Sequence, residues 1–149
     1  MKLELQVTQP NTGKLLKAFG VQLKAENYWR FLPGKRIWEL IPRNKTQIFD
    51  NKNETVPAFT LFDLGNMIPW GFLQNVIVHK MPGGFWQTEL SDKKTHSFPS
   101  ETEARAFYLI DLLKSKQVDV DQINHPEKYN VVMPSGKAYP KKKKASSGQ

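Results

Sequence analysis

The clearest pattern of apolar and polar positions lies between Val76 and Lys116. It begins with β-branched residues, which suit a strand, and a Pro-Gly-Gly run then marks a turn. Beyond the turn, alternate side chains would point to opposite faces of a second strand. The pattern predicts strands at residues 76–78, 85–90 and 95–98, with turns at residues 82–84 and 91–94.

A helix is predicted directly after the third strand, from Ser100 to Lys116. Ser100 is a favourable N-cap, and Glu103 three residues later completes a capping box. Apolar side chains follow at helical spacing and form a stripe that must be buried: Ala106, Phe107, Leu109, Ile110, Leu112 and Leu113. The preceding strands offer the nearest apolar surface, so we expect the helix to pack on one face of their sheet.

This β-β-β-α pattern resembles the small DNA-binding modules at the N-terminus of some phage integrases. Those modules also have an aromatic strand, a polar turn, an entry of the type T-x-S-F-P-S and a helix that opens with Glu-Ala. Here the entry is Thr95 to Ser100, and the helix opens with Glu103-Ala104. The resemblance covers residues 76–116 and implies DNA binding for that part of the chain.

The N-terminal part is expected to form two hairpins. Residues 3–7 alternate as in a half-buried strand, and residues 9–13 have the composition of a turn. Residues 14–24 fit a short helix or a strand; Gly20 argues against a long helix, so we expect a strand that pairs with residues 3–7. The second hairpin is predicted at residues 28–41, around a Pro-Gly turn.

The remaining segments have weaker patterns. We expect a loop at residues 43–57 with a short strand at 48–49, a short helix or irregular connector at 59–72, a turn at 124–127 and an edge strand at 129–133. From Pro134 onward the composition cannot bury apolar surface. The predicted organisation is a single compact α+β domain, residues 1–133, followed by a disordered basic tail, residues 134–149. The domain would be a mostly antiparallel sheet with the main helix, in the C-terminal half, on one face.

Composition narrows the function classes. The chain has 149 residues and no cysteine, which excludes disulfides, cysteine–zinc sites, iron–sulfur clusters and thiol catalysis. No apolar run approaches the roughly 20 residues that span a bilayer, and residues 1–6 lack the apolar region of a secretory signal. We therefore expect a cytoplasmic protein without membrane insertion.

Residue patterns typical of enzymes are missing from the sequence. The three histidines, His79, His96 and His125, have no metal-ligand spacing. Neither a nucleophile elbow, a Walker loop nor a dinucleotide fingerprint occurs. The expectation is a non-catalytic protein without a metal or cofactor.

The net charge of +8 is concentrated in two segments. Residues 14–45 carry a net +6 and residues 137–149 a net +5. Single-stranded nucleic acid binds where bases stack on aromatic rings and cations follow the backbone, and flexible basic arms bind phosphates without sequence preference. The predicted nucleic-acid-binding residues are therefore Tyr28, Arg30, Lys35, Arg36, Trp38, Arg43, Lys137, Lys141, Lys142, Lys143 and Lys144. Lys80, Lys93 and Lys94 form a smaller basic group, diluted by acidic neighbours.

Other interpretations of the same residues stay open. The rings of the second hairpin could all be core residues, and its cations ordinary surface charge. The tail could be merely solubilising, or could bind anionic membranes beside another anchor. The rival function is a small protein-binding adaptor or inhibitor, of the type carried by phages and mobile elements. It would act through an exposed aromatic patch at Phe59–Phe62 or Trp70–Phe72.

Two observations would separate these functions. A continuous basic face that includes Arg30, Lys35 and Arg36 favours nucleic acid. A large apolar patch or an extensive dimer interface favours the adaptor.

Overall fold

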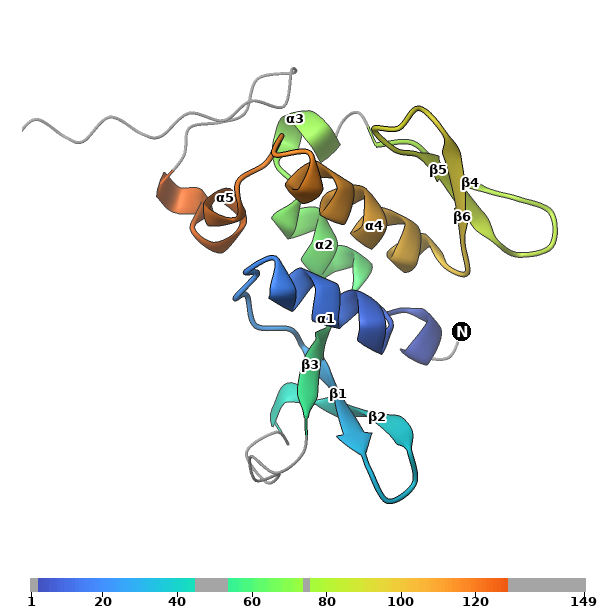
Figure 1. The fold of residues 1–149 in the computed structure, drawn as a ribbon, viewed down its shortest axis with the longest axis vertical. Coiled ribbons are helices and arrows are strands. Elements are labelled where there is room, and N and C mark those ends of the chain that lie inside the picture. Colours follow the sequence, from blue (N-terminus) through green and yellow to red (C-terminus); the bar gives the residue numbers. More distant parts are fainter. Residues whose placement is uncertain (1–2, 45–53, 74–75, 129–149) are drawn as a thin grey trace, which may run out of the picture.

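The computed structural model describes residues 3–44, 54–73 and 76–128. In chain order its elements are η1 (Leu3–Leu5), α1 (Pro10–Ala18), β1 (Asn27–Leu32), β2 (Ile37–Pro42), β3 (Thr55–Ala58), α2 (Leu61–Met67), α3 (Trp70–Leu73), β4 (Val78–Lys80), β5 (Trp86–Glu89), β6 (Thr95–Phe98), α4 (Glu101–Lys114), α5 (Val120–Asn124) and η3 (Pro126–Lys128). The predicted α+β class is confirmed, although the strands form two small antiparallel sheets rather than one. One sheet lies at an end of the molecule and the other beside α4 (Figure 1).

The first sheet has the strand order β2-β1-β3. The predicted second hairpin is confirmed, because β1 and β2 pair from Asn27 opposite Pro42 to Leu32 opposite Ile37. β3 pairs with the other edge of β1, in a stretch where we expected a loop. Its sequence is short and contains Pro57, which argues against a central strand but is tolerated in an edge strand such as β3. Its pairing with β1 is what identifies it as a strand.

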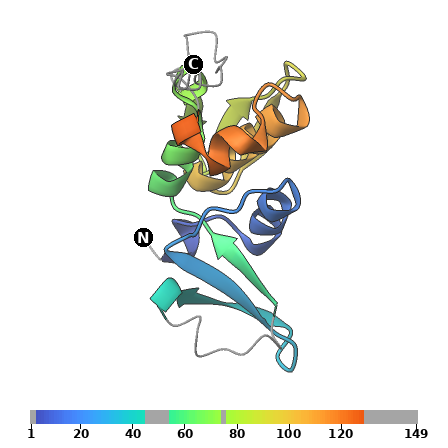
Figure 2. The same cartoon turned by 90° about the vertical axis from the view of Figure 1, so that its left-hand side faces the viewer.

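One face of this sheet is anchored by Trp29. The Trp29 side chain is buried, and its indole N–H donates to the Thr8 backbone oxygen at 2.7 Å. Val7, Val56 and Ala58 pack around it as a small separate core. The face is therefore closed by the segment that precedes α1, and α1 itself crosses β3 beside it (Figure 2).

The hairpin predicted at the N-terminus is wrong. Leu3–Leu5 form a 3-10 turn, and Pro10–Ala18 form a helix. Proline suits the first helical position because its missing N–H has no partner there in any case, so Pro10 opens α1 rather than a turn. Val7 makes only an isolated antiparallel bridge with Thr60.

The β-β-β-α arrangement predicted at residues 76–116 is confirmed, with β4 beginning at Val78 rather than Val76. Ser100 caps α4, and its hydroxyl oxygen accepts a hydrogen bond from the Glu103 N–H at 3.1 Å. The second half of the predicted capping box is not formed. The Glu103 carboxylate instead accepts hydrogen bonds from the start of α1.

α4 lies at the centre of the molecule and packs against α1, α2 and each strand of the second sheet. Its predicted stripe is buried except for Phe107, which is partly buried: Ala106 and Leu109 have no exposed surface, and Ile110 is 2% exposed. The main core joins these side chains to residues from both halves of the chain: Leu16, Val21, Ala25, Phe59, Leu64, Met67, Ile68, Phe72, Val118 and Ile123.

Several expectations fall outside the described residues. These are the strands at residues 48–49 and 129–133, the domain boundary at residue 133 and the basic tail. Within the described part of the chain, no helix has the length and apolar character needed to cross a membrane.

Candidate functional site

The aromatic residues of the β1–β2 hairpin are partly engaged in packing. Tyr28 is half-buried against the main core, and its hydroxyl oxygen accepts a hydrogen bond from the Ala25 N–H at 3.3 Å. Trp38 is also half-buried, with its ring centroid 5.1 Å from that of Phe31. The Lys14 ammonium lies 5.1 Å from the centroid of Trp38. Both rings therefore contribute to the fold, and their predicted contact with bases stays a prediction.

The cations of the hairpin differ in their exposure and in whether they form ion pairs. Arg30 is 14% exposed and forms an ion pair with Glu39 on the neighbouring strand. Arg43 lies 3.7 Å from Glu26, and both side chains are largely exposed. Lys35 and Arg36, at the turn, are exposed, and Arg36 adopts the left-handed backbone conformation at φ 54°.

The charge of the described part is almost balanced. It contains 14 lysines and arginines against 13 aspartates and glutamates, whereas the whole chain has a net charge of +8. The five predicted tail residues, Lys137, Lys141, Lys142, Lys143 and Lys144, lie outside the described residues. Most of the positive excess therefore belongs to residues outside the described part of the chain.

The second sheet presents a face that no described element covers. α4 packs on the face that carries Thr88 and Trp86, so His79, Gln87 and Ser97 point away from it. The Gln87 amide donates to the Ser97 hydroxyl at 3.2 Å. On this outer face His79 and Ser97 are exposed and Gln87 is half-buried, and the exposed ring of Phe85 lies on the same side. The lysines in the turn that follows β5 are also exposed.

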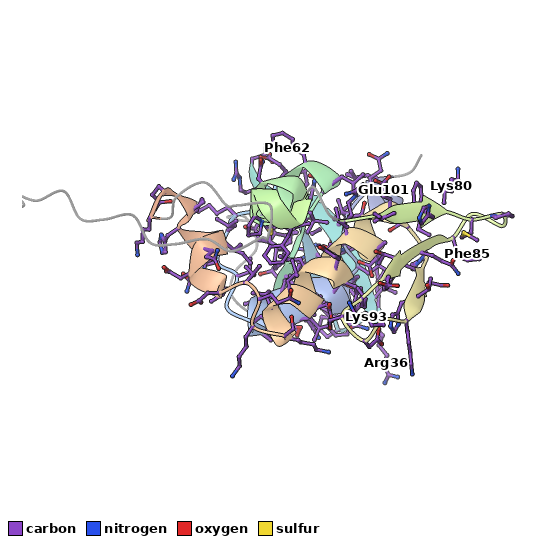
Figure 3. The ribbon with its side chains drawn as sticks, turned by 90° about the horizontal axis from the view of Figure 1, so that it is seen from above. Arg36, Phe62, Lys80, Phe85, Lys93 and Glu101 are labelled. Atoms are coloured by element: carbon purple, nitrogen blue, oxygen red, sulfur yellow. The ribbon has the colours of Figure 1, made fainter. Side chains whose placement is uncertain are left out.

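A groove of about 540 Å³ lies where the N-terminal turns of α2 and α4 meet the second sheet. We call it the Phe62 groove; its lining includes Leu61, Phe62, Lys80, Trp86, Pro99 and Glu101. Phe62 is 78% exposed and Leu61 38%. In Figure 3, Phe62, Glu101 and Lys80 follow one another along one side of the molecule, and Phe62 points away from it.

The sequence predicted only part of this surface. The expected Phe59–Phe62 patch is smaller than predicted, because Phe59 is completely buried; Phe72, in the other expected patch, is buried too. Thr60 and Asp63 form a capping box that starts α2 at Leu61. That start places Phe62 on the side of the helix opposite Leu64 and Met67, which are buried. The T-x-x-D spacing was the signal that could have identified the exposed ring.

The titratable side chains outside these surfaces form few clusters. His96 Nε2 lies 2.8 Å from Asp92 Oδ2. The backbone N–H of Lys94, followed by His96, lowers the pKa of Asp92. No group of three histidine, aspartate or glutamate side chains is arranged to hold a metal ion in the part of the chain that the structure describes.

Comparisons of the chain with models of known protein families, with curated proteins and with solved structures gave no significant match.

Proposed function

We propose that the protein is a non-catalytic nucleic-acid-binding protein that contacts the phosphate backbone, largely without sequence preference. The observation that carries this proposal is the uneven distribution of charge along the chain: the described residues are almost neutral, whereas the whole chain has a net charge of +8. A block of lysines next to a segment of balanced charge is typical of arms that bind nucleic acid. The lysines of residues 137–144 would supply most of the phosphate contacts.

The tip of the β1–β2 hairpin would supply a second set of contacts. Lys35 and Arg36 are exposed, and neither forms an ion pair within the described residues. Arg30 is held by Glu39, so it would act mainly in the fold. Binding through these cations would be electrostatic and would weaken as salt is added.

The second sheet adds independent support for DNA as the nucleic acid. β4, β5, β6 and α4 have the order of elements on which the resemblance to phage integrase modules rests. Their outer face offers hydrogen-bonding side chains, among them His79, Gln87 and Ser97. Sheet readers place such strands in a groove of the duplex.

The hairpin contribution is tested by replacing Lys35 and Arg36 with Gln. Fluorescence anisotropy with labelled single-stranded and duplex oligonucleotides would measure affinity over a salt series. Loss of two phosphate contacts should reduce the log–log salt slope by about 1.4 on single strands or about 1.8 on duplex.

The matched control is the replacement of Lys17 and Lys24 with Gln, which removes the same charge from exposed positions outside the hairpin. An equal loss of slope in this control would show that only net charge matters, and would remove the hairpin from the proposal.

A second candidate function, a protein-binding adaptor, is favoured by one observation. Phe62 and Leu61 are exposed beside a groove with aromatic and proline lining. Exposed aromatic side chains next to a groove are typical of protein interfaces.

A further inference from the structure

The Phe62 groove is built from rigid parts. The Thr60 hydroxyl oxygen accepts from the Asp63 N–H at 3.1 Å, and the Thr60 N–H donates to the Asp63 carboxylate at 2.9 Å. On the facing side, the Thr102 hydroxyl donates to the Gln6 backbone oxygen at 3.3 Å. The first turns of α2 and α4 are therefore fixed before any partner binds, which lowers the entropic cost of binding.

The charges around the groove favour an acidic occupant. Glu101 is already paired with Arg105, whose Nε lies 2.9 Å from the carboxylate. Lys80 is exposed and has no ion-pair partner within the described residues. The rim therefore offers one unneutralised positive charge beside an apolar surface formed by Phe62, Leu61 and Trp86.

The exposure of Phe62 indicates the size of the occupant. A small-molecule site encloses its aromatic lining and most of its ligand, whereas the Phe62 ring is 78% exposed. A groove that binds nucleic acid needs several cations along the path of the nucleic-acid backbone. Lys80 is the only cation among the described residues that line this groove. A partner that covers Phe62 must itself bring apolar surface.

We infer that the Phe62 groove binds a peptide segment of a partner protein that combines an apolar side chain with a carboxylate. The apolar side chain lies between Phe62 and Trp86, and the carboxylate pairs with Lys80. This inference does not depend on nucleic-acid binding, because its residues lie neither in the hairpin tip nor in the tail, and Lys80 and Trp86 lie on the face of the second sheet opposite His79 and Gln87.

The test is a selection of a phage-displayed random dodecapeptide library on the immobilised full-length protein. We expect enrichment of peptides that carry an aromatic or branched aliphatic residue together with Asp or Glu. The selected peptide is then synthesised, labelled and titrated with the parent and its variants. If no peptide is enriched, or if enriched peptides lack acidic residues, the inference is overturned.

Phe62→Ala is the first variant, and Phe85→Ala is its matched control. Phe85 is also an exposed ring, but it follows Gly84 on the outer side of β5 and does not line the groove. Phe62→Ala should weaken peptide binding by roughly 30-fold or more, as loss of a central aromatic anchor does. Phe85→Ala should change it by less than about two-fold. Equal effects of the two variants contradict the inference.

Lys80→Glu tests the charge. It should weaken binding of the acidic peptide by about ten-fold, and a second selection on this variant should enrich basic peptides. Lys93→Glu makes the same change of charge in the turn after β5. A selection on this control variant should still enrich acidic peptides. An unchanged selection on Lys80→Glu overturns the inference.

Two further outcomes distinguish this inference from its alternatives. Sedimentation showing that Phe62→Ala dissociates a dimer of the parent would assign the groove to a second copy of the chain, and would overturn the inference. Loss of oligonucleotide binding in Phe62→Ala, without an effect on peptides, would overturn it while leaving the proposed nucleic-acid function standing.

Discussion

At the scale of single residues, Glu103 is the one charged residue that is buried in the described part of the chain. It is 4% exposed. It accepts a hydrogen bond from the Gln9 N–H at 3.0 Å and from the Thr12 hydroxyl at 2.7 Å. One acid in the first turn of α4 thus serves the N-terminus of α1, which is the favourable helix end for a negative group. Burial nevertheless raises the pKa of Glu103, and the two hydrogen bonds offset only part of that effect.

The raised pKa predicts a pH-dependent stability. The folded protein holds the Glu103 proton more tightly than the unfolded chain, whose pKa is near 4.5. The contribution of this group is therefore fully present below that pH and is lost as the pH rises through the folded-state pKa. Glu103→Gln does not titrate and keeps an acceptor and a donor. Urea denaturation should show the parent losing stability relative to Glu103→Gln as the pH rises above 4.5.

Thr12→Val provides a second test of the same contact. It preserves the side-chain shape but removes the hydroxyl that lowers the pKa of Glu103. The loss of stability with rising pH should therefore extend to higher pH than in the parent. A difference between parent and Glu103→Gln that is constant over pH, or a Thr12→Val curve parallel to that of the parent, would contradict this account.

At the scale of elements, α1 is formed where the sequence predicts a turn at residues 9–13 and, after it, a strand. Gly13 lies inside this helix, and a Cβ added there would sit 2.3 Å from the Pro57 carbonyl oxygen. The glycine that suggests a turn in the sequence is required for the close approach of α1 to β3. Gly65 in α2 has nothing within 4 Å of an added Cβ.

These two glycines give a matched pair of predictions. Alanine is a better helix former than glycine by about 1 kcal/mol, so Gly65→Ala should stabilise the protein by up to that amount. Gly13→Ala should instead destabilise it by roughly 1–3 kcal/mol, because the helix or β3 must shift. Thermal and urea unfolding of both variants measures the difference. If Gly13→Ala is as stable as Gly65→Ala, the packing of α1 on β3 is wrong.

The elements that sequence reasoning predicted are those with local determinants. The strands and helix of residues 76–116 are marked by turn residues, a serine cap and helical spacing, and the second hairpin by its Pro-Gly turn. α1 and β3 were missed because contacts between residues far apart in the sequence define them. Glu103 accepts hydrogen bonds from Gln9 and Thr12, which lie more than 90 residues earlier in the chain, and β3 is a strand through its pairing with β1. The exposed ring of Phe62 was anticipated only as part of a larger patch, since the burial of Phe59 depends on the assembled core.

At the scale of the whole molecule, α4 connects parts that would otherwise be independent. It contacts α1 and α2 on one side and the β4–β6 sheet on the other. Eight of its residues are buried. The described residues should therefore unfold as one unit.

Two probes test this cooperativity. Tryptophan fluorescence, to which buried Trp29 in the first sheet contributes, and far-ultraviolet circular dichroism should give coincident unfolding curves. Ile110→Asp, which places an unpaired charge at a 2% exposed position, should cost several kcal/mol and lower both transitions together. Separate transitions would indicate two domains. Unchanged melting of Ile110→Asp would mean that the buried face of α4 is wrongly assigned.

The distribution of charge over the whole molecule carries the central functional claim. The described part holds almost no net charge, and residues 137–149 hold a net +5. If these lysines bind phosphates, each one contributes separately to the salt dependence of binding. The fold should not depend on them.

The most direct measurement compares the parent with a full-length variant in which Lys137 and Lys141–Lys144 are replaced by Gln. Anisotropy with labelled oligonucleotides over a salt series gives the slope of log affinity against log salt. We predict tight binding by the parent at low salt, and a slope flatter in the variant by up to about 3.5 on single strands or 4.5 on duplex. Absence of binding by the parent at low salt, or an unchanged slope in the variant, would contradict the proposed function.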